Sequence, residues 1–268
     1  MELVGRRIRL LGIAKFFAVN TAGLTVLNSK LDCVGANPRL RYSMKRIRTV
    51  EDIVRWRLCV GCGACSYVCP EQAIELIDVV NEGIRPRVRT VDCQDCPAPC
   101  LQVCPSHLSD FSESVRVPGE MQELSDLWGP VLEIWEGHAT DQEIRYRSAS
   151  GGVLTALSLY CLEKEGMAGV LHIGQDPDNA LRNRTRLSRS RSQLLENTGS
   201  RYAPASACDS LLEIESAPRP CVFIGQPSEV VALRKAQRLR PGLNAKVGLA
   251  MSFFWTSMVW SRLAMSFF

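Results

Sequence analysis

The sequence of 268 residues lacks the features that mark exported, membrane-spanning or nucleic-acid-binding proteins. An apolar stretch runs to about Leu27, but Lys15 and Asn20 interrupt it and no small-x-small cleavage site follows, which argues against an export signal and a membrane span. Residues 1–48 hold ten Lys or Arg against two acids, a net charge of +8, whereas the whole chain carries only +4. The remainder is therefore mildly acidic, and no nucleic-acid partner is expected.

We expect residues 1–48 to be a basic lead, either disordered or an extended translation start placed ahead of Met44. The segment that begins at Met44 would then open the working fold as an ordinary first helix. The pair Arg6-Arg7 before the apolar stretch leaves one alternative, a twin-arginine signal for a protein that is exported already folded.

Cysteine, by contrast, is abundant, with twelve residues, eight of them between Cys59 and Cys104. The first block reads C-x2-C-x2-C-x3-C-P and ends at Pro70, which is the bacterial spacing for ligating a four-iron, four-sulfur cluster. Gly61 and Gly63 are expected to take positive φ there. A zinc site leaves half of this pattern unexplained, and a disulfide staple belongs to small secreted domains. Clustered thiols favour a reducing compartment, so a cytoplasmic location is expected.

A second block, C-x2-C-x3-C-x3-C-P, ends at Pro105 and approximately repeats the first. Its wider gap, which contains two prolines, would alter the cluster potential or make that site three-iron or labile. The segments Ile74–Val79 and Arg87–Val91 predict a hairpin between the blocks, so residues 49–106 read as a ferredoxin-like module for two [4Fe-4S] clusters. In such modules the fourth cysteine of each block crosses to the other cluster. One cluster is thus assigned Cys59, Cys62, Cys65 and Cys104, and the other Cys93, Cys96, Cys100 and Cys69.

Beyond a linker at residues 107–127, apolar segments alternate with helical ones over residues 128–254. Such alternation is typical of a mainly parallel sheet covered by helices, so the expected fold is an α+β ferredoxin-like module followed by an α/β domain. The predicted strands are 131–139, 169–174, 185–188, 219–225 and 246–253, and the predicted helices are 150–164, 190–197 and 227–237.

The helix predicted from Ser150 would use that serine as its N-cap. Gly151 and Gly152 would then expose backbone amides at the positive end of the helix, where Arg145 and Arg147 add charge and a phosphate would bind. A glycine-rich cap without a ligand explains the same residues equally well. Because ligands of α/β folds lie at the carboxyl ends of strands, the turn after residue 224 would share any such ligand.

Several motifs follow one another in residues 45–254. Besides the two thiol blocks, they are Trp128-Gly-Pro, Ala139-Thr-Asp141-Gln-Glu-Ile-Arg145, Ser150-Gly-Gly, Gly199-Ser-Arg-Tyr202, Gly225-Gln-Pro227 and Val231-Ala-Leu-Arg234. Together they resemble the coenzyme F420 hydrogenase/dehydrogenase beta-subunit family of iron–sulfur flavoproteins.

The resemblance implies an oxidoreductase subunit with two [4Fe-4S] clusters and FAD. It would pass electrons to or from coenzyme F420, a deazaflavin, or a similar carrier, beside a redox partner protein or a larger oxidoreductase subunit. Flavin is the natural converter between one-electron clusters and a two-electron carrier. No catalytic side chain is implied. The flavin pocket would be lined by Ser150, Gly151 and Gly152, with Ser200, Tyr202, Gly225 and Pro227 as further candidates.

Two positions depart from the family pattern. Ser228 stands where the family has the cysteine of Gly-Thr/Lys-Pro-Cys, and Trp255 stands where it has the cysteine of Phe-Phe-Cys. Residues 255–268 form an apolar tail whose end repeats Leu249–Phe254, so a C-terminal truncation or frameshift is expected in preference to a membrane anchor. An incomplete flavin domain leaves an alternative function, a ferredoxin-like carrier whose second domain only docks a partner.

Overall fold

The computed structural model describes residues 3–7, 47–89, 96–107, 119–121, 131–254 and 262–266. The chain divides into two units, of which the first comprises residues 1–4, 47–110 and 137–268 and the second residues 5–46 and 111–136. The first unit holds both the cysteine-rich segment and the sheet. Most of the predicted basic lead and linker lies outside the described residues, which include β1 (Leu3–Arg7), residues 47–48, residue 107 and residues 119–121 of these segments.

The cysteine-rich segment begins with a short capped helix, α2 (Val50–Arg55). Thr49 accepts the backbone N–H of Asp52 at 3.2 Å while the Asp52 carboxylate accepts the N–H of Thr49 at 3.2 Å, which is a capping box. The helix therefore begins at Val50, six residues beyond the Met44 at which the sequence suggested a start. Two further helices follow in this segment, α3 (Ala64–Val68) and α4 (Pro99–Gln102).

The predicted hairpin is present, as β2 (Ile74–Val79) paired antiparallel with β3 (Gly83–Val88). The predicted second strand, Arg87–Val91, was placed too late, because the strand already begins at Gly83. Pro86 lies within β3, which tolerates a residue without an N–H because each strand of a two-stranded sheet is an edge strand.

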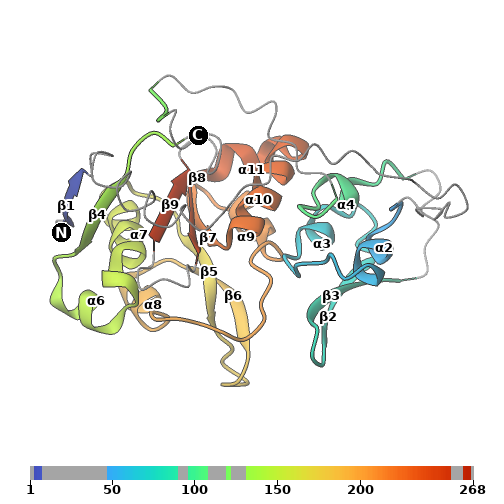
Figure 1. Ribbon diagram of the computed structural model, residues 1–268, viewed down its shortest axis with the longest axis horizontal. Helices are drawn as coiled ribbons and strands as arrows, with labels where there is room; N and C mark the ends of the chain where they lie inside the picture. Colours follow the sequence, from blue (N-terminus) through green and yellow to red (C-terminus); the bar gives the residue numbers. More distant parts are fainter. Residues whose placement is uncertain are drawn as a thin grey trace, which may run out of the picture. The chain divides into compact units, whose positions relative to one another are not determined.

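The sheet of the first unit has five strands in the order β6-β5-β7-β8-β9 (Figure 1). The central strands β5, β7 and β8 are parallel, whereas β6 and β9 pair antiparallel at the two edges. The prediction of a mainly parallel sheet therefore holds for the centre only, because β6 follows β5 after a short turn without a crossover helix. The strands are β5 (Val170–Gln175), β6 (Asn183–Ser188), β7 (Cys221–Gly225), β8 (Val247–Phe254) and β9 (Arg262–Ser266).

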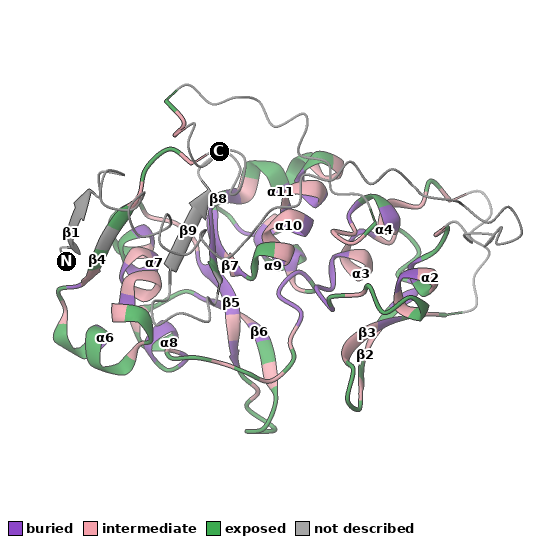
Figure 2. Ribbon diagram, in the orientation of Figure 1, coloured by how far each residue is buried: buried purple, intermediate pink, exposed green. Residues whose placement is uncertain are grey.

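Helices lie on both faces of this sheet, and the residues of β7 alternate between them. Cys221 and Phe223 belong to one buried cluster, while Val222 and Ile224 pack with the other. The first cluster continues from α9, α10 and α11 into the cysteine-rich segment through Val68 and other residues. Figure 1 shows α7 on one side of the sheet and α9 to α11 on the other, and Figure 2 shows the buried central strands. The helices are α6 (Gln142–Arg147), α7 (Val153–Glu163), α8 (Arg191–Leu195), α9 (Leu211–Glu215), α10 (Pro227–Leu239) and α11 (Pro241–Lys246).

Several predicted boundaries change. The first strand of the domain is β4 (Trp135–Ala139), which begins four residues after the predicted Val131. The helix predicted from Ser150 begins at Val153, after a 3-10 turn over Ser150–Gly152, and α9 and α11 were not predicted at all. In the described part of the chain, no helix is both long and apolar enough to cross a membrane.

Candidate metal centre

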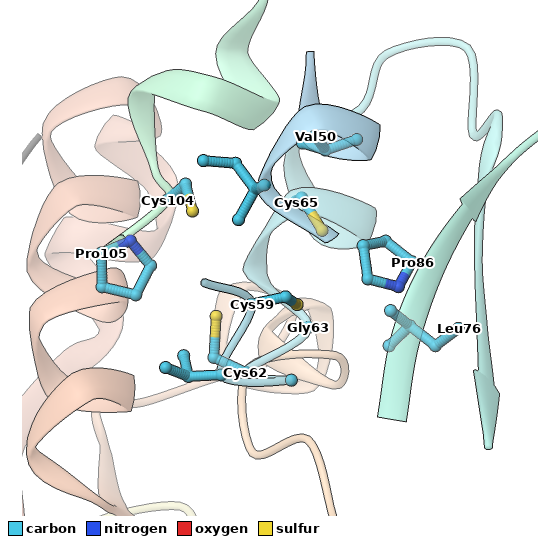
Figure 3. A pocket seen from close by; sticks show the side chains of 12 residues that line it. Val50, Cys59, Cys62, Gly63, Cys65, Leu76, Pro86, Cys104 and Pro105 are labelled. Carbon is cyan, nitrogen blue, oxygen red and sulfur yellow. The ribbon is translucent and has the colours of Figure 1, made fainter. Parts of the chain in front are cut away.

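Four thiols, drawn from both blocks, line one small pocket (Figure 3). Three come from the first block, Cys59, Cys62 and Cys65, and the fourth is Cys104 from the second. These are the four residues that the sequence assigned to one cluster. The cavity is about 20 Å³, and apolar side chains make up most of the remaining wall. These are Val50, Ile53, Val60, Leu76, Pro86 and Pro105.

The remaining thiols of the second assigned set also lie close together. Burial raises the pKa of Cys100, and the neighbouring thiols of Cys69 and Cys96 raise it further, while the Leu101 N–H opposes them. The fourth residue assigned to this set, Cys93, lies outside the described residues. Within those residues, no three His, Cys, Asp or Glu side chains already stand in metal-coordinating geometry.

The loop that carries the first block depends on two left-handed glycines. Gly61 has φ 73° and Gly63 has φ 84°, so the predicted positive φ at both positions is confirmed. A Cβ on Gly61 would lie 2.8 Å from the Ile84 carbonyl oxygen, and one on Gly63 would lie 2.9 Å from the Asp209 backbone nitrogen. Gly63 therefore lets this loop approach the α/β domain closely, a role that the sequence did not reveal.

Burial disfavours the ionised form of three of the pocket thiols, Cys62, Cys65 and Cys104. Burial raises the pKa of Cys62 to about 12 and raises that of Cys65 as well. Burial also raises the pKa of Cys104, although the backbone N–H groups of Ser106 and His107 are hydrogen-bonded to its sulfur and oppose the shift. A metal displaces such protons, and N–H groups directed at sulfur then stabilise the thiolates. The donor set, the apolar wall and these N–H groups all suit an iron–sulfur cluster.

The cysteine loop is hydrogen-bonded directly to the α/β domain. The Cys208 N–H donates to the Cys62 carbonyl at 2.9 Å, and the Ser206 hydroxyl donates to the Gly61 carbonyl at 2.6 Å. Cys208 is fully buried, so this contact is part of the core. Cys208 lies outside both cysteine blocks of the sequence, and no local sequence pattern indicated this contact.

The same segment is connected to the turn that follows β7. The Glu229 carboxylate accepts the Ala207 N–H at 3.0 Å on one oxygen and the Gln226 N–H at 2.7 Å on the other. Glu229 is buried, and burial raises its pKa. A continuous set of hydrogen bonds thus joins the Cys62 loop to the start of α10. Gln226 and Glu229 have the three-residue spacing of a capping box, so this helix start could have been recognised in the sequence.

A second contact joins the two parts through α3. The Tyr67 hydroxyl donates to Glu215 at 2.8 Å, and Arg240 donates to the same carboxylate oxygen at 2.8 Å. The Arg240 guanidinium also lies over the Tyr67 ring, 5.3 Å from its centroid. The orientation of the cysteine-rich segment on the α/β domain is therefore fixed at two places.

The glycine loop before α7 differs from its prediction. Ser150 has φ 52° and does not cap the helix; Gly152 is the N-cap residue and no side chain caps it. A Cβ on Gly152 would lie 2.8 Å from Ile144 Cγ2, and one on Gly151 would lie 3.1 Å from His138 Cβ. The chain's own packing thus requires both glycines. Arg147 donates to Glu143 and to the Leu195 carbonyl, so its charge is engaged within the fold.

The other flavin candidates lie near the carboxyl ends of the parallel strands. Asn197 accepts the N–H of Gln175, the last residue of β5, at 3.2 Å, which places the segment before Ser200 and Tyr202 at that edge. Tyr202 is 84% exposed. Gly225 ends the neighbouring strand β7, and Pro227 is the first residue of α10. Arg147 links the Ser150 loop to the same segment through Leu195.

The family models match the chain in two places. Residues 58–108 match the 4Fe-4S dicluster domain, and residues 134–213 match the N-terminal domain of the coenzyme F420 hydrogenase/dehydrogenase beta subunit. The second match confirms, for residues 134–213, the resemblance to the coenzyme F420 hydrogenase/dehydrogenase beta-subunit family. The two matches relate the chain to iron–sulfur dicluster domains and to an oxidoreductase beta subunit.

Among curated proteins, the chain is similar to a heterodisulfide-reductase-like protein of Archaeoglobus profundus, with 29% identity over 30% of this chain and 16% of that protein. It is also similar to an isethionate sulfite-lyase activating enzyme of Desulfovibrio desulfuricans, with 31% identity over 35% of this chain and 24% of the relative. The matches thus span less than a quarter of each relative's length. A solved F420-reducing [NiFe] hydrogenase complex from Methanosarcina barkeri matches 44% of each chain, with 24% identity and a TM-score of 0.37.

Proposed function

We propose that this chain is an iron–sulfur flavoprotein subunit that carries two [4Fe-4S] clusters and FAD. It passes electrons between a partner oxidoreductase and a deazaflavin, coenzyme F420, or a similar carrier. The observation that carries the proposal is the pocket in which thiols of both blocks meet, within a module bonded directly to the α/β domain. One-electron carriers fixed to such a domain need a two-electron centre to exchange hydride, and flavin supplies that chemistry when it is bound.

The chain's own residues have distinct roles in this proposal. Cys59, Cys62, Cys65 and Cys104 hold one cluster, and the backbone N–H groups at Ser106 and His107 stabilise the Cys104 thiolate. Cys69, Cys93, Cys96 and Cys100 hold the other cluster.

The flavin would lie at the carboxyl edge of the sheet. Ser200, Tyr202, Gly225 and Pro227 lie at or beside the strand ends there, and the Ser150-Gly-Gly loop is linked to the same segment. The proposal of a flavin site rests mainly on the position of these residues at the strand ends. Gly151 and Gly152 support it less, because their packing against His138 and Ile144 already explains why glycine is present there.

Anaerobic purification followed by iron, sulfide and flavin analysis tests the proposal. About eight irons and one FAD per chain are expected, with bleaching of the flavin absorbance on addition of reduced F420. The missing thiol at Ser228 favours one alternative, a ferredoxin-like carrier whose second domain only docks a partner. Iron without flavin would support that alternative, and zinc without iron would refute both.

A further inference from the structure

One lysine of the α/β domain reaches the wall of the thiol pocket. Lys235 lies on α10, and its Nζ donates a hydrogen bond to the Cys104 carbonyl oxygen at 2.6 Å. Cys104 also contributes its thiol to the pocket, so the ammonium is hydrogen-bonded to the backbone of a proposed cluster ligand. The Lys235 side chain is therefore held beside the pocket by a direct hydrogen bond to one of its four cysteines.

The position of Lys235 along α10 relates the pocket to the proposed flavin edge. The helix begins at Pro227, directly after β7, and Lys235 lies eight residues further along. At 1.5 Å per residue, one rigid helix spans the roughly 12 Å between these two positions. The helix that carries Lys235 thus extends from the proposed flavin edge to the Cys104 backbone.

We infer that Lys235 raises the reduction potential of the cluster held by Cys59, Cys62, Cys65 and Cys104, so that electrons collect on this cluster, which lies against the α/β domain. This inference rests on the proposed function. Reduction adds one electron to the cluster, from reduced flavin in the protein or from dithionite in a titration, and no bond is made or broken. A nearby positive charge stabilises the more negative, reduced form more than the oxidised form.

The inference predicts a change at one of the two clusters only. The set of Cys69, Cys96 and Cys100 does not line this pocket, and its potential should change little.

Potentiometric titration of the full-length, iron-loaded protein, followed by EPR, tests this role. Lys235→Gln keeps an N–H donor for the Cys104 carbonyl but removes the charge, Lys235→Arg keeps the charge, and Lys235→Met is a second neutral variant. Arg238→Gln is the matched control, because Arg238 is exposed on the same helix three residues later. One potential should fall in the two neutral variants by about 59 mV, a tenfold change in the ratio of reduced to oxidised cluster. The potentials of both clusters should stay unchanged in Lys235→Arg and in Arg238→Gln.

Unmoved potentials in the neutral variants, an equal fall at both clusters, or the same fall in Arg238→Gln would overturn the inference. Iron content and the EPR signals are measured first. A wild-type protein without clusters refutes the proposed function itself, whereas two clusters with unmoved potentials refute only the role of Lys235.

Discussion

The backbone N–H of Cys208 donates to the carbonyl oxygen of Cys62 at 2.9 Å, so a residue of the α/β domain holds the backbone of a proposed cluster ligand. Cys208 is itself a thiol, and its sulfur lies 3.4 Å from the Glu229 carbonyl oxygen, to which it donates. The contact makes the cysteine-rich segment an extension of the domain core.

Substitution of Cys208 should separate this packing role from metal binding. Cys208→Ala removes a fully buried sulfur and should lower the free energy of unfolding by about 1–2 kcal/mol, with the iron content unchanged. Cys161→Ala removes a buried thiol from the opposite face of the sheet and should show a similar loss. Iron analysis with denaturant unfolding checks both variants. Loss of half of the iron in Cys208→Ala alone would identify Cys208 as a ligand.

Serine substitutions should reveal the crossed arrangement of the clusters. Because Cys104 shares its pocket with Cys59, Cys104→Ser and Cys59→Ser should remove or alter the same EPR signal. Cys100→Ser should affect the other signal, since Cys100 lies beside Cys69 and Cys96. The assignment is wrong if Cys104→Ser and Cys100→Ser change one signal in common and leave that of Cys59 intact.

Gly63→Ala should loosen the attachment of the cysteine loop. The substitution forces a side chain into φ 84° and places its Cβ 2.9 Å from the Asp209 nitrogen, where backbone must move. Gly119 also has positive φ, 90°, but no atom of the described residues lies within 4 Å of its added Cβ, so Gly119→Ala is the matched control.

Gly119→Ala should lower the free energy of unfolding by about 1–2 kcal/mol, because alanine is strained at positive φ. Gly63→Ala should lower it clearly more. Unfolding free energies and iron retention measure both variants. Equal costs would show that the close approach to Asp209 does not matter.

His172 should make the fold less stable in mild acid. Burial lowers its pKa to about 4, while Nε2 lies 2.8 Å from the Ser188 hydroxyl and Nδ1 lies 3.1 Å from the Ile173 carbonyl oxygen. The unfolded chain, with a pKa near 6.5, binds this proton more readily, so stability falls as pH drops below about 6.5 toward 4.

At pH 5.5 this residue should contribute a loss of about 1 kcal/mol relative to pH 7.5. The unfolding free energy of His172→Gln should differ between the two pH values by about 1 kcal/mol less than that of the wild-type protein. An unchanged pH dependence in His172→Gln would contradict the expected titration.

Local patterns predicted much of the fold. The helix after Gly225-Gln226-Pro227 begins with proline at its first position as predicted, because proline lacks an N–H and fixes φ where a helix starts. The buried strands β5, β7 and β8 were found from apolar runs bounded by glycine and proline. The start of α7 was missed, because Ser150 resembles an N-cap in sequence while the contact of Gly152 with Ile144 moves the cap two residues later.

The sequence by itself predicted the two thiol sets, because the spacing of the cysteines along the chain restricts how they can meet around one cluster. The positive φ of Gly61 and Gly63 could likewise be predicted from the local sequence. Only the tertiary structure decided what stands next to the pocket. Glu229 and Lys235 lie more than 120 residues from Cys104, and no local pattern carries a contact of that range. These contacts depend on how α10 packs against the cysteine-rich segment through a shared buried cluster.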